Sequence, residues 1–214
     1  NGEQTFPEII DALKQAKNHI HIEYYIYEDD EIGNEIKKIL IEKAKEGVAV
    51  RFIYDDFGSR SIRKRMVKEL KESGVEVYPF YKITFISLAN RINYRNHRKI
   101  IVIDGETAFV GGINISEKYS NPNSNHLYWR DTHIKIKGSA AAHLQYIFLC
   151  DWNFCTGNQI EINQDFFRRD VSSDAKVPIQ IAASGPDSDS PTILYSIIQA
   201  ISKAKHEVLI TTPY

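Results

Sequence analysis

Cysteine is scarce in this sequence, with only Cys150 and Cys155 among 214 residues. Neither has a second Cys or a His pair at the spacing of a zinc site, and two thiols cannot form a framework of several disulfides. The pattern predicts buried, reduced thiols that pack as small apolar side chains. It also favours a reducing compartment, and therefore the cytoplasmic side of any membrane.

The sequence also lacks an excess of charge of one sign, because 27 Lys and Arg residues are matched by 28 Asp and Glu residues. Proteins that attract nucleic acid or anionic lipid over their whole surface normally carry an excess of Lys and Arg. Such binding is therefore expected only at local patches. No run approaches the roughly 20 apolar residues of a membrane span, and the start has no signal-peptide pattern. The segment itself is expected to be soluble, and its flanks are expected to hold any membrane segments.

Helices and strands are predicted to alternate along most of the chain. Thr5 begins a capping-box pattern with Pro7 in the first turn, which predicts that a helix starts there. Asp104 and Gly105 form a strong hairpin signal. In chain order the next predicted elements are a strand at 20–27, a helix at 32–46, a strand at 48–54, a helix at 61–73, strands at 75–80, 99–103, 107–110 and 131–137, and a helix at 139–154. This order implies an α/β sandwich with a mixed central sheet.

The end of the chain echoes its beginning. Residues 12–17 and 20–22 are similar to residues 200–205 and 208–210 at one constant offset, so that a helix leading into a strand recurs. Chance similarity between two amphipathic helices is one explanation, and the start of a second copy of the domain is the other. The second explanation divides the chain into a first domain, 1–176, and a linker strand with the truncated beginning of a second domain, 177–214.

The motif that carries chemistry lies near the middle of the chain. His97 and Lys99 are two residues apart on a predicted strand, so their side chains should project from the same face. Asp104 follows Lys99 after four residues, and a Gly-Gly-x-Asn sequence ending at Asn114 follows after six more. A lone His near a Lys is usually a surface pair. A match at several points with fixed spacing favours a catalytic motif instead.

This pattern resembles the His-Lys-Asp motif of the phospholipase D superfamily. The flanking segments 93–99 and 129–133 are similar to those of bacterial cardiolipin synthases in particular, and the resemblance extends over essentially the whole chain. It implies the first catalytic half of such an enzyme. The fold would be an α-β-α sandwich, with one complete repeat and the start of a second.

The chemistry of phosphodiesters explains the residue types in the motif. A phosphodiester is an anion, so a neutral imidazole is a suitable nucleophile, and an ammonium and an amide suit the phosphate oxygens. His97 is expected to form a phosphohistidine or to protonate the leaving oxygen. Lys99 and Asn114 would hold the non-bridging oxygens, and Gly112 would let the backbone approach closely. No metal or other cofactor is required.

Two aspartates receive different expectations. Asp104 belongs to the family motif, yet its place in an Asp-Gly turn favours a structural role in the hairpin over a catalytic one. The resemblance implies that Asp131 accepts a hydrogen bond from His97 and fixes its tautomer, with an ordinary surface position as the alternative. His133 begins a second His-x-Lys sequence, but the rest of the motif is missing, so no catalytic role is expected for it.

The resemblance implies a phosphatidyltransferase that makes cardiolipin from two phosphatidylglycerol molecules at the cell membrane. Its partners would be anionic membrane lipids, with no nucleic acid. The family normally combines two motifs, one histidine attacking and the other acting as general acid, and this sequence contains one. A second half in the same chain or a two-fold dimer would supply the other. A homodimeric phosphodiesterase or nuclease and a non-catalytic half-domain remain as alternatives.

Two surface segments have alternative interpretations. A basic cluster either faces anionic headgroups or forms a solvated helix face. It consists of Arg60, Arg63, Lys64, Arg65 and Lys68. The apolar segment 80–88 either enters a bilayer interface or lies buried beside the site.

Overall fold

The computed structural model describes residues 1–82, 95–121, 127–157, 160–167, 177–185 and 188–212. The chain forms two compact units, Asn1–Pro178 and Ile179–Tyr214. Most of the apolar segment 80–88 lies outside the described residues, so its expected role is not addressed by the structure.

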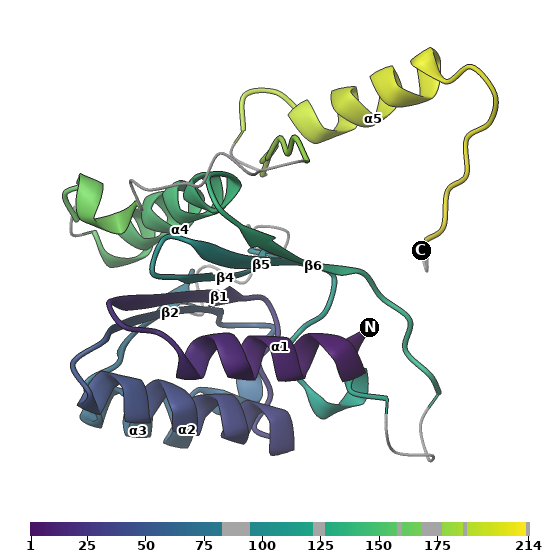
Figure 1. Ribbon diagram of the computed structural model, residues 1–214. Helices are drawn as coiled ribbons and strands as arrows, with labels where there is room; N and C mark the ends of the chain where they lie inside the picture. The colour runs from purple at the N-terminus through teal and green to yellow at the C-terminus, as the bar shows by residue number, and fades with distance from the viewer. Residues whose placement is uncertain (83–94, 122–126, 158–159, 168–176, 186–187, 213–214) are drawn as a thin grey trace. The chain divides into compact units, whose positions relative to one another are not determined.

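The first unit is built on a six-stranded sheet with the strand order β3-β2-β1-β4-β5-β6 (Figure 1). The strands β1 to β3 are parallel, whereas β4, β5 and β6 are antiparallel to their neighbours. Their bounds are β1 His19–Tyr24, β2 Ala49–Asp55, β3 Glu76–Phe80, β4 Lys99–Ile103, β5 Thr107–Gly111 and β6 His133–Lys137. The predicted α/β sandwich with a mixed sheet is confirmed.

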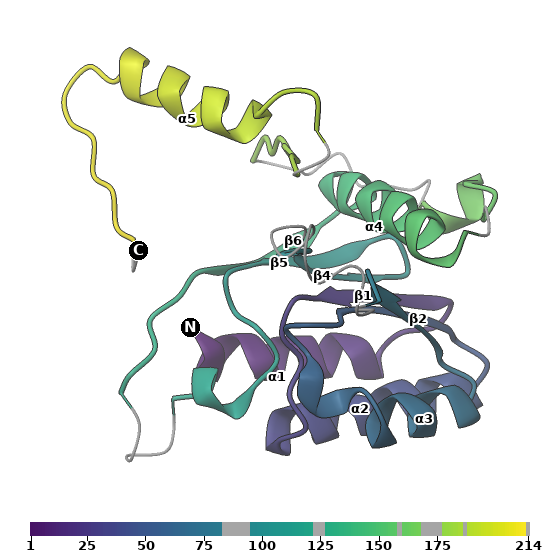
Figure 2. The same cartoon turned by 180° about the vertical axis from the view of Figure 1, so that it is seen from behind.

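Helices cover both faces of this sheet, α1, α2 and α3 on one side and α4 on the other (Figures 1 and 2). Their bounds are α1 Gly2–Lys14, α2 Glu31–Lys45, α3 Arg65–Glu72 and α4 Ala140–Thr156, with short 3-10 turns at η1 Arg60–Ile62, η2 Glu117–Tyr119 and η3 Gln164–Phe166. Every residue of β1 is buried, because the strand is covered on both faces.

The predicted hairpin is confirmed in detail. Asp104 and Gly105 both have positive φ, 53° and 65°. The backbone N–H of Glu106 donates to Ile103 O over 3.1 Å, which closes a two-residue turn between β4 and β5. Positive φ at both central residues matches the right-handed twist of the strands that the turn joins.

The first helix begins earlier than predicted. α1 starts at Gly2, not at Thr5, and Pro7 lies inside it. Gly2 approaches η2 so closely that a Cβ atom would lie 1.8 Å from Tyr119 O. Since Thr5 is also buried, tertiary packing extends the helix upstream of its local start signal.

Two further expectations are corrected. The helix predicted at 61–73 is divided into η1 and α3, and between them the side chain of Arg63 donates to Asp56 O. Both cysteines are free, but Cys150 is exposed and Cys155 is partly exposed, so the prediction of two buried thiols is wrong. The inner positions of α4 are filled by larger side chains such as Phe148 and Trp152.

The second unit contains the helix α5, Thr192–Lys203, which matches the helix predicted from the echo. Residues 208–210, where the echo predicts a strand, form none within the described part of the chain. A strand exists only when a neighbour accepts and donates its backbone hydrogen bonds.

Among the described residues, no helix is long and apolar enough to cross a bilayer.

Candidate functional site

All of the predicted motif except Asp104 lies at the end of the sheet where the parallel strands finish. Because β4 is antiparallel to β1, with Lys99 opposite Tyr24, the start of β4 meets the carboxyl end of β1. β5 ends and β6 begins at the same edge, where Gly111 is opposite His133. The carboxyl ends of parallel strands are the usual place for ligands in open α/β sheets.

His97 lies against the ring of Tyr25, the residue that follows β1. The two rings are stacked, with 3.9 Å between centroids and an angle of 19° between planes. Partial burial lowers the pKa of His97, and the charge of Lys99 lowers it further. Asp55 opposes this effect, whereas Arg95 adds to it. The imidazole is therefore neutral at pH 7, as a nucleophile must be.

Lys99 shares the same aromatic support. Its Nζ atom donates to His97 O over 2.7 Å and lies 5.3 Å from the centroid of the Tyr25 ring. Burial lowers the pKa of Lys99 to about 8, and Asp131 opposes the shift. At pH 7 the ammonium is still charged and lies beside the histidine.

A buried residue anchors the segment that carries both side chains. The Nδ2 group of Asn96 donates to Glu23 Oε1 on β1, and its backbone N–H donates to Asp55 Oδ2 over 3.3 Å. Its Oδ1 accepts from the backbone N–H of Arg98 over 2.9 Å. Asn96 therefore fixes the chain on both sides of His97.

The carboxyl group of Glu23 is unusual for a strand interior. It is 1% exposed, and burial raises its pKa well above the ordinary range, with the charge of Asp151 adding to the effect. Arg98 forms an ion pair with Asp151. Sequence reasoning missed this anchor, although an acidic residue inside an otherwise apolar strand is a signal that could have indicated it.

Asn114 is buried, and both ends of its amide have internal partners. Oδ1 accepts from the backbone N–H of Ile26 over 3.2 Å, and Nδ2 donates to Tyr119 Oη over 3.0 Å. These bonds hold the segment after β5 to the segment after β1. Phosphate binding by Asn114 stays a prediction, and it would use the second Nδ2 hydrogen.

Gly112 is needed for a close approach within the protein. A Cβ atom at this position would lie 2.1 Å from Asp131 Oδ1, so no other residue fits without a shift. The backbone N–H of Gly112 also donates to Thr132 O over 3.0 Å. The glycine thus brings the Asp131 carboxylate to the edge of β5.

Asp131 does not contact His97 in the described part of the chain. Its Oδ1 accepts from the backbone N–H of Thr132 and its Oδ2 from Trp129 Nε1. Its charge instead raises the pKa of Lys99 and of His133, against the effect of burial on each. The orienting role of Asp131 therefore stays a prediction, and it requires the carboxylate to turn toward His97.

His133 lies nearer to the site than its broken motif suggested. Burial lowers its pKa to about 4, with Asp131 opposing, so the ring is neutral. Both ring nitrogens are buried, and neither has a hydrogen-bond partner within the described structure. The Gly111 opposite it on β5 leaves room for the ring, because a Cβ there would lie 2.7 Å from His133 Nδ1.

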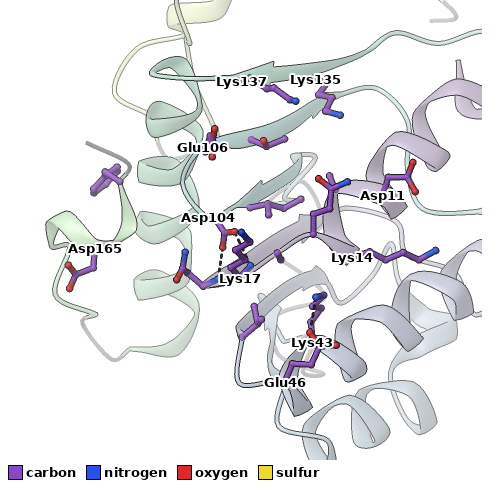
Figure 3. A pocket seen from close by; sticks show the side chains of 18 residues that line it. Asp11, Lys14, Lys17, Lys43, Glu46, Asp104, Glu106, Lys135, Lys137 and Asp165 are labelled. Atoms are coloured by element: carbon purple, nitrogen blue, oxygen red, sulfur yellow. Dashed lines mark hydrogen bonds and ion pairs between the residues drawn. The ribbon is translucent and has the colours of Figure 1, made fainter. Parts of the chain in front are cut away.

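Asp104 lies at the other end of β4, away from the rest of the motif. Its carboxylate accepts three backbone N–H groups at the α1–β1 connection, those of Lys17, Asn18 and His19, over 2.9, 2.7 and 2.9 Å. A pocket of about 1090 Å³ opens beside it, and both lysine and acidic side chains line it (Figure 3). The contacts of Asp104 are thus structural, and they join the β4–β5 turn to the α1–β1 connection.

With this geometry established, comparison with known proteins identifies the family. A family profile described as cardiolipin synthase, PLD-like domain, matches residues 9–152. The chain belongs to this family. The match includes every residue of the site from His97 to His133, and it ends before the second unit.

Curated members of the family align with the chain along its whole length. Cardiolipin synthase 2 of Bacillus cereus is 46% identical over 214 residues, which are 100% of this chain and 42% of that protein. The chain therefore spans about two fifths of the length of such relatives.

Solved structures agree with the fold. Phosphatidylserine synthase from Haemophilus influenzae aligns with a TM-score of 0.54 and 19% identity, over 71% of this chain and 35% of that one. Nuc, a phospholipase D family member from Salmonella typhimurium, aligns with a TM-score of 0.51 and 19% identity, over 69% of this chain and 86% of that one. These likenesses show the phospholipase D-like fold alone, and they assign no role to any side chain of this chain.

Proposed function

We propose that the protein containing this chain transfers a phosphatidyl group from one phosphatidylglycerol molecule to the hydroxyl of another, releasing glycerol and forming cardiolipin. The observation that carries this proposal is the stacking of His97 on Tyr25, with Lys99 Nζ held beside the histidine by its hydrogen bond to His97 O. Membership of a family whose curated relatives are named cardiolipin synthases supports the choice of substrate.

Each step of the reaction has a residue with suitable chemistry. A ring nitrogen of His97 attacks the donor phosphorus, forming a P–N bond as the P–O bond to glycerol breaks. Lys99 stabilises the charge on the non-bridging oxygens, and Asn114 is the predicted amide donor to them. A general acid protonates the departing glycerol oxygen. The hydroxyl of the second phosphatidylglycerol then attacks the phosphorus, releases His97, and gives its proton to the same group acting as base.

The general acid is proposed to be the histidine of a second motif. This chain holds the full motif once, so the partner histidine would come from a second phospholipase D-like half or from another copy of the chain. The reaction would take place at the cell membrane, since both substrates are membrane lipids, and the two free thiols favour its cytoplasmic side.

The test uses the complete protein and phosphatidylglycerol labelled in its phosphate, in mixed micelles. The expected products are labelled cardiolipin, free glycerol and an acid-labile label on the protein. His97→Ala should give none of the three. His143→Ala is the matched control, because it removes an exposed histidine on α4 outside the site. Cardiolipin formation by His97→Ala at the wild-type rate would overturn the proposal.

A further inference from the structure

An exposed aromatic ring carries two arginines beside the site. Phe57 follows β2 and is 37% exposed. The guanidinium carbons of Arg60 and Arg95 each lie 4.1 Å from the centroid of its ring. The two carbons can therefore be no more than twice that distance apart, and one aromatic ring holds both positive charges.

This arginine pair adjoins His97. Asp55 Oδ1 accepts the backbone N–H groups of Phe57 and Gly58 over 2.9 and 2.8 Å, which fixes the turn. Gly58 packs so tightly on the Tyr25 backbone that a Cβ atom would lie 2.3 Å from Tyr25 O. Tyr25 is the ring on which His97 stacks. The second arginine is also tied to His97, because Arg95 lies two residues before it in the sequence.

The two guanidinium groups have no carboxylate partner among the described residues. Other arginines of the same region do: Arg63 pairs with Asp56 over 3.1 Å, and Arg98 pairs with Asp151. Two like charges on one ring repel each other. An anion bound beside the edge of the Phe57 ring, within reach of both guanidinium groups, would reduce this repulsion and accept hydrogen bonds from both forks.

We propose that Arg60 and Arg95, supported by Phe57, bind the phosphate of the acceptor phosphatidylglycerol. The inference rests on the proposed function and assigns its second substrate a binding site. The attacking hydroxyl of the acceptor belongs to a glycerol whose other end carries a phosphodiester anion. When that hydroxyl reaches the phosphorus on His97, the acceptor phosphate must lie one three-carbon glycerol away. The arginine pair is connected to His97 by Arg95, two residues before it in the chain, and by Gly58, which packs on Tyr25.

This assignment separates the two phosphates of the reaction. The donor phosphate is held by Lys99 at His97, and the acceptor phosphate by the arginine pair. Water and simple alcohols have no negatively charged group, so the arginine pair would not bind them as acceptors. The arginines would therefore select a phospholipid acceptor over neutral ones.

The test is a competition between acceptors in the complete protein. Vesicles of phosphatidylglycerol are incubated with ethanol, and the ratio of cardiolipin to phosphatidylethanol is measured. Each of Arg60→Gln and Arg95→Gln should lower the ratio by about tenfold, and the double variant by more, because each removes one charge-assisted contact with the acceptor phosphate. Phe57→Leu should lower it less, since the cations remain without their support.

Lys64→Gln is the matched control, because it removes an exposed cation from the same segment that has no contact with Phe57 among the described residues. Its ratio should equal that of the wild type. An unchanged ratio in the double variant would overturn the assignment, and so would an equal loss of both products. If the wild type made neither product, the proposed function would fail, and the acceptor site with it.

Discussion

The ammonium of Lys99 is both close to the nucleophile and partly buried, and burial lowers its pKa from 10.5 to about 8. The charged form is the one that stabilises phosphate oxygens. As pH rises through about 8 the ammonium loses its proton, so we expect the rate of phosphohistidine formation to fall on the alkaline side. The measurement is the rate of label incorporation into the complete protein between about pH 6 and about pH 11, a range that includes both values.

Lys99→Arg supplies the matched variant for this pH profile. A guanidinium keeps its proton at every pH in this range. The fall in rate should therefore move to higher pH in this variant, even if its maximum rate is lower. An alkaline limb near pH 8 that stayed in place in Lys99→Arg would show that another group titrates there, and Lys99 would lose its assigned role.

His97 and Lys99 could be predicted from sequence because their spacing on a strand is local. The residues that support them could not. Tyr25 and Glu23 are far from His97 in sequence, and they reach it only because β1 pairs with β4. No local pattern states which strands will be neighbours in a sheet.

The expected contact between Asp131 and His97 illustrates the same limit. Family resemblance supplies a role for a residue, but the side chain's direction depends on what surrounds it. Here Trp129 and Thr132 hold the carboxylate near Lys99 and His133. The role therefore remains a prediction for a state in which substrate is bound.

At the level of elements, Asp104 joins the β4–β5 turn to the start of β1. Asp104→Ala removes the acceptor of three backbone N–H groups and places alanine at φ 53°. We expect the free energy of unfolding to fall by about 2 to 4 kcal/mol, measured by urea denaturation. Asp104→Asn keeps a side-chain acceptor and tolerates positive φ, so it should lose about 1 kcal/mol.

Activity separates this structural role from a catalytic one. Asp104 lies at the opposite end of β4 from His97, so both variants should retain activity when they are assayed folded, well below the unfolding transition. A complete loss of phosphohistidine formation by folded Asp104→Asn would show that the aspartate of the motif acts in the chemistry.

Elements were predictable where their ends are set by local chemistry. α2 ends before Gly47, whose φ of 92° suits glycine, and the hairpin turns at Asp104 and Gly105. α1 starts at Gly2, where close contact with Tyr119 places it, and these two residues are far apart in the sequence. Elements that end on tertiary contacts were therefore misplaced, although the order of helices and strands was right.

At the level of the whole molecule, both units contain a helix of the same pattern. α1 buries Ile9, Ile10 and Leu13 in the core of the first unit, where they are at most 8% exposed. At the offset of the echo, their counterparts in α5 are Ile197, Ile198 and Ile201, which are 50%, 50% and 43% exposed. If the second unit begins another copy of the domain, these side chains should pack on the sheet of that copy in the complete protein.

Hydrogen exchange measured by mass spectrometry tests this expectation. A helix of about 12 residues is marginally stable in water without packing. The amides of α5 should therefore exchange fast in this chain alone and slowly in the complete protein, whereas those of α1 should be protected in both. Equal, fast exchange of α5 in both proteins would mean that the echo is a chance similarity of two amphipathic helices. The echo would then no longer support a second histidine in the same chain, and a two-fold dimer would be the arrangement to test next.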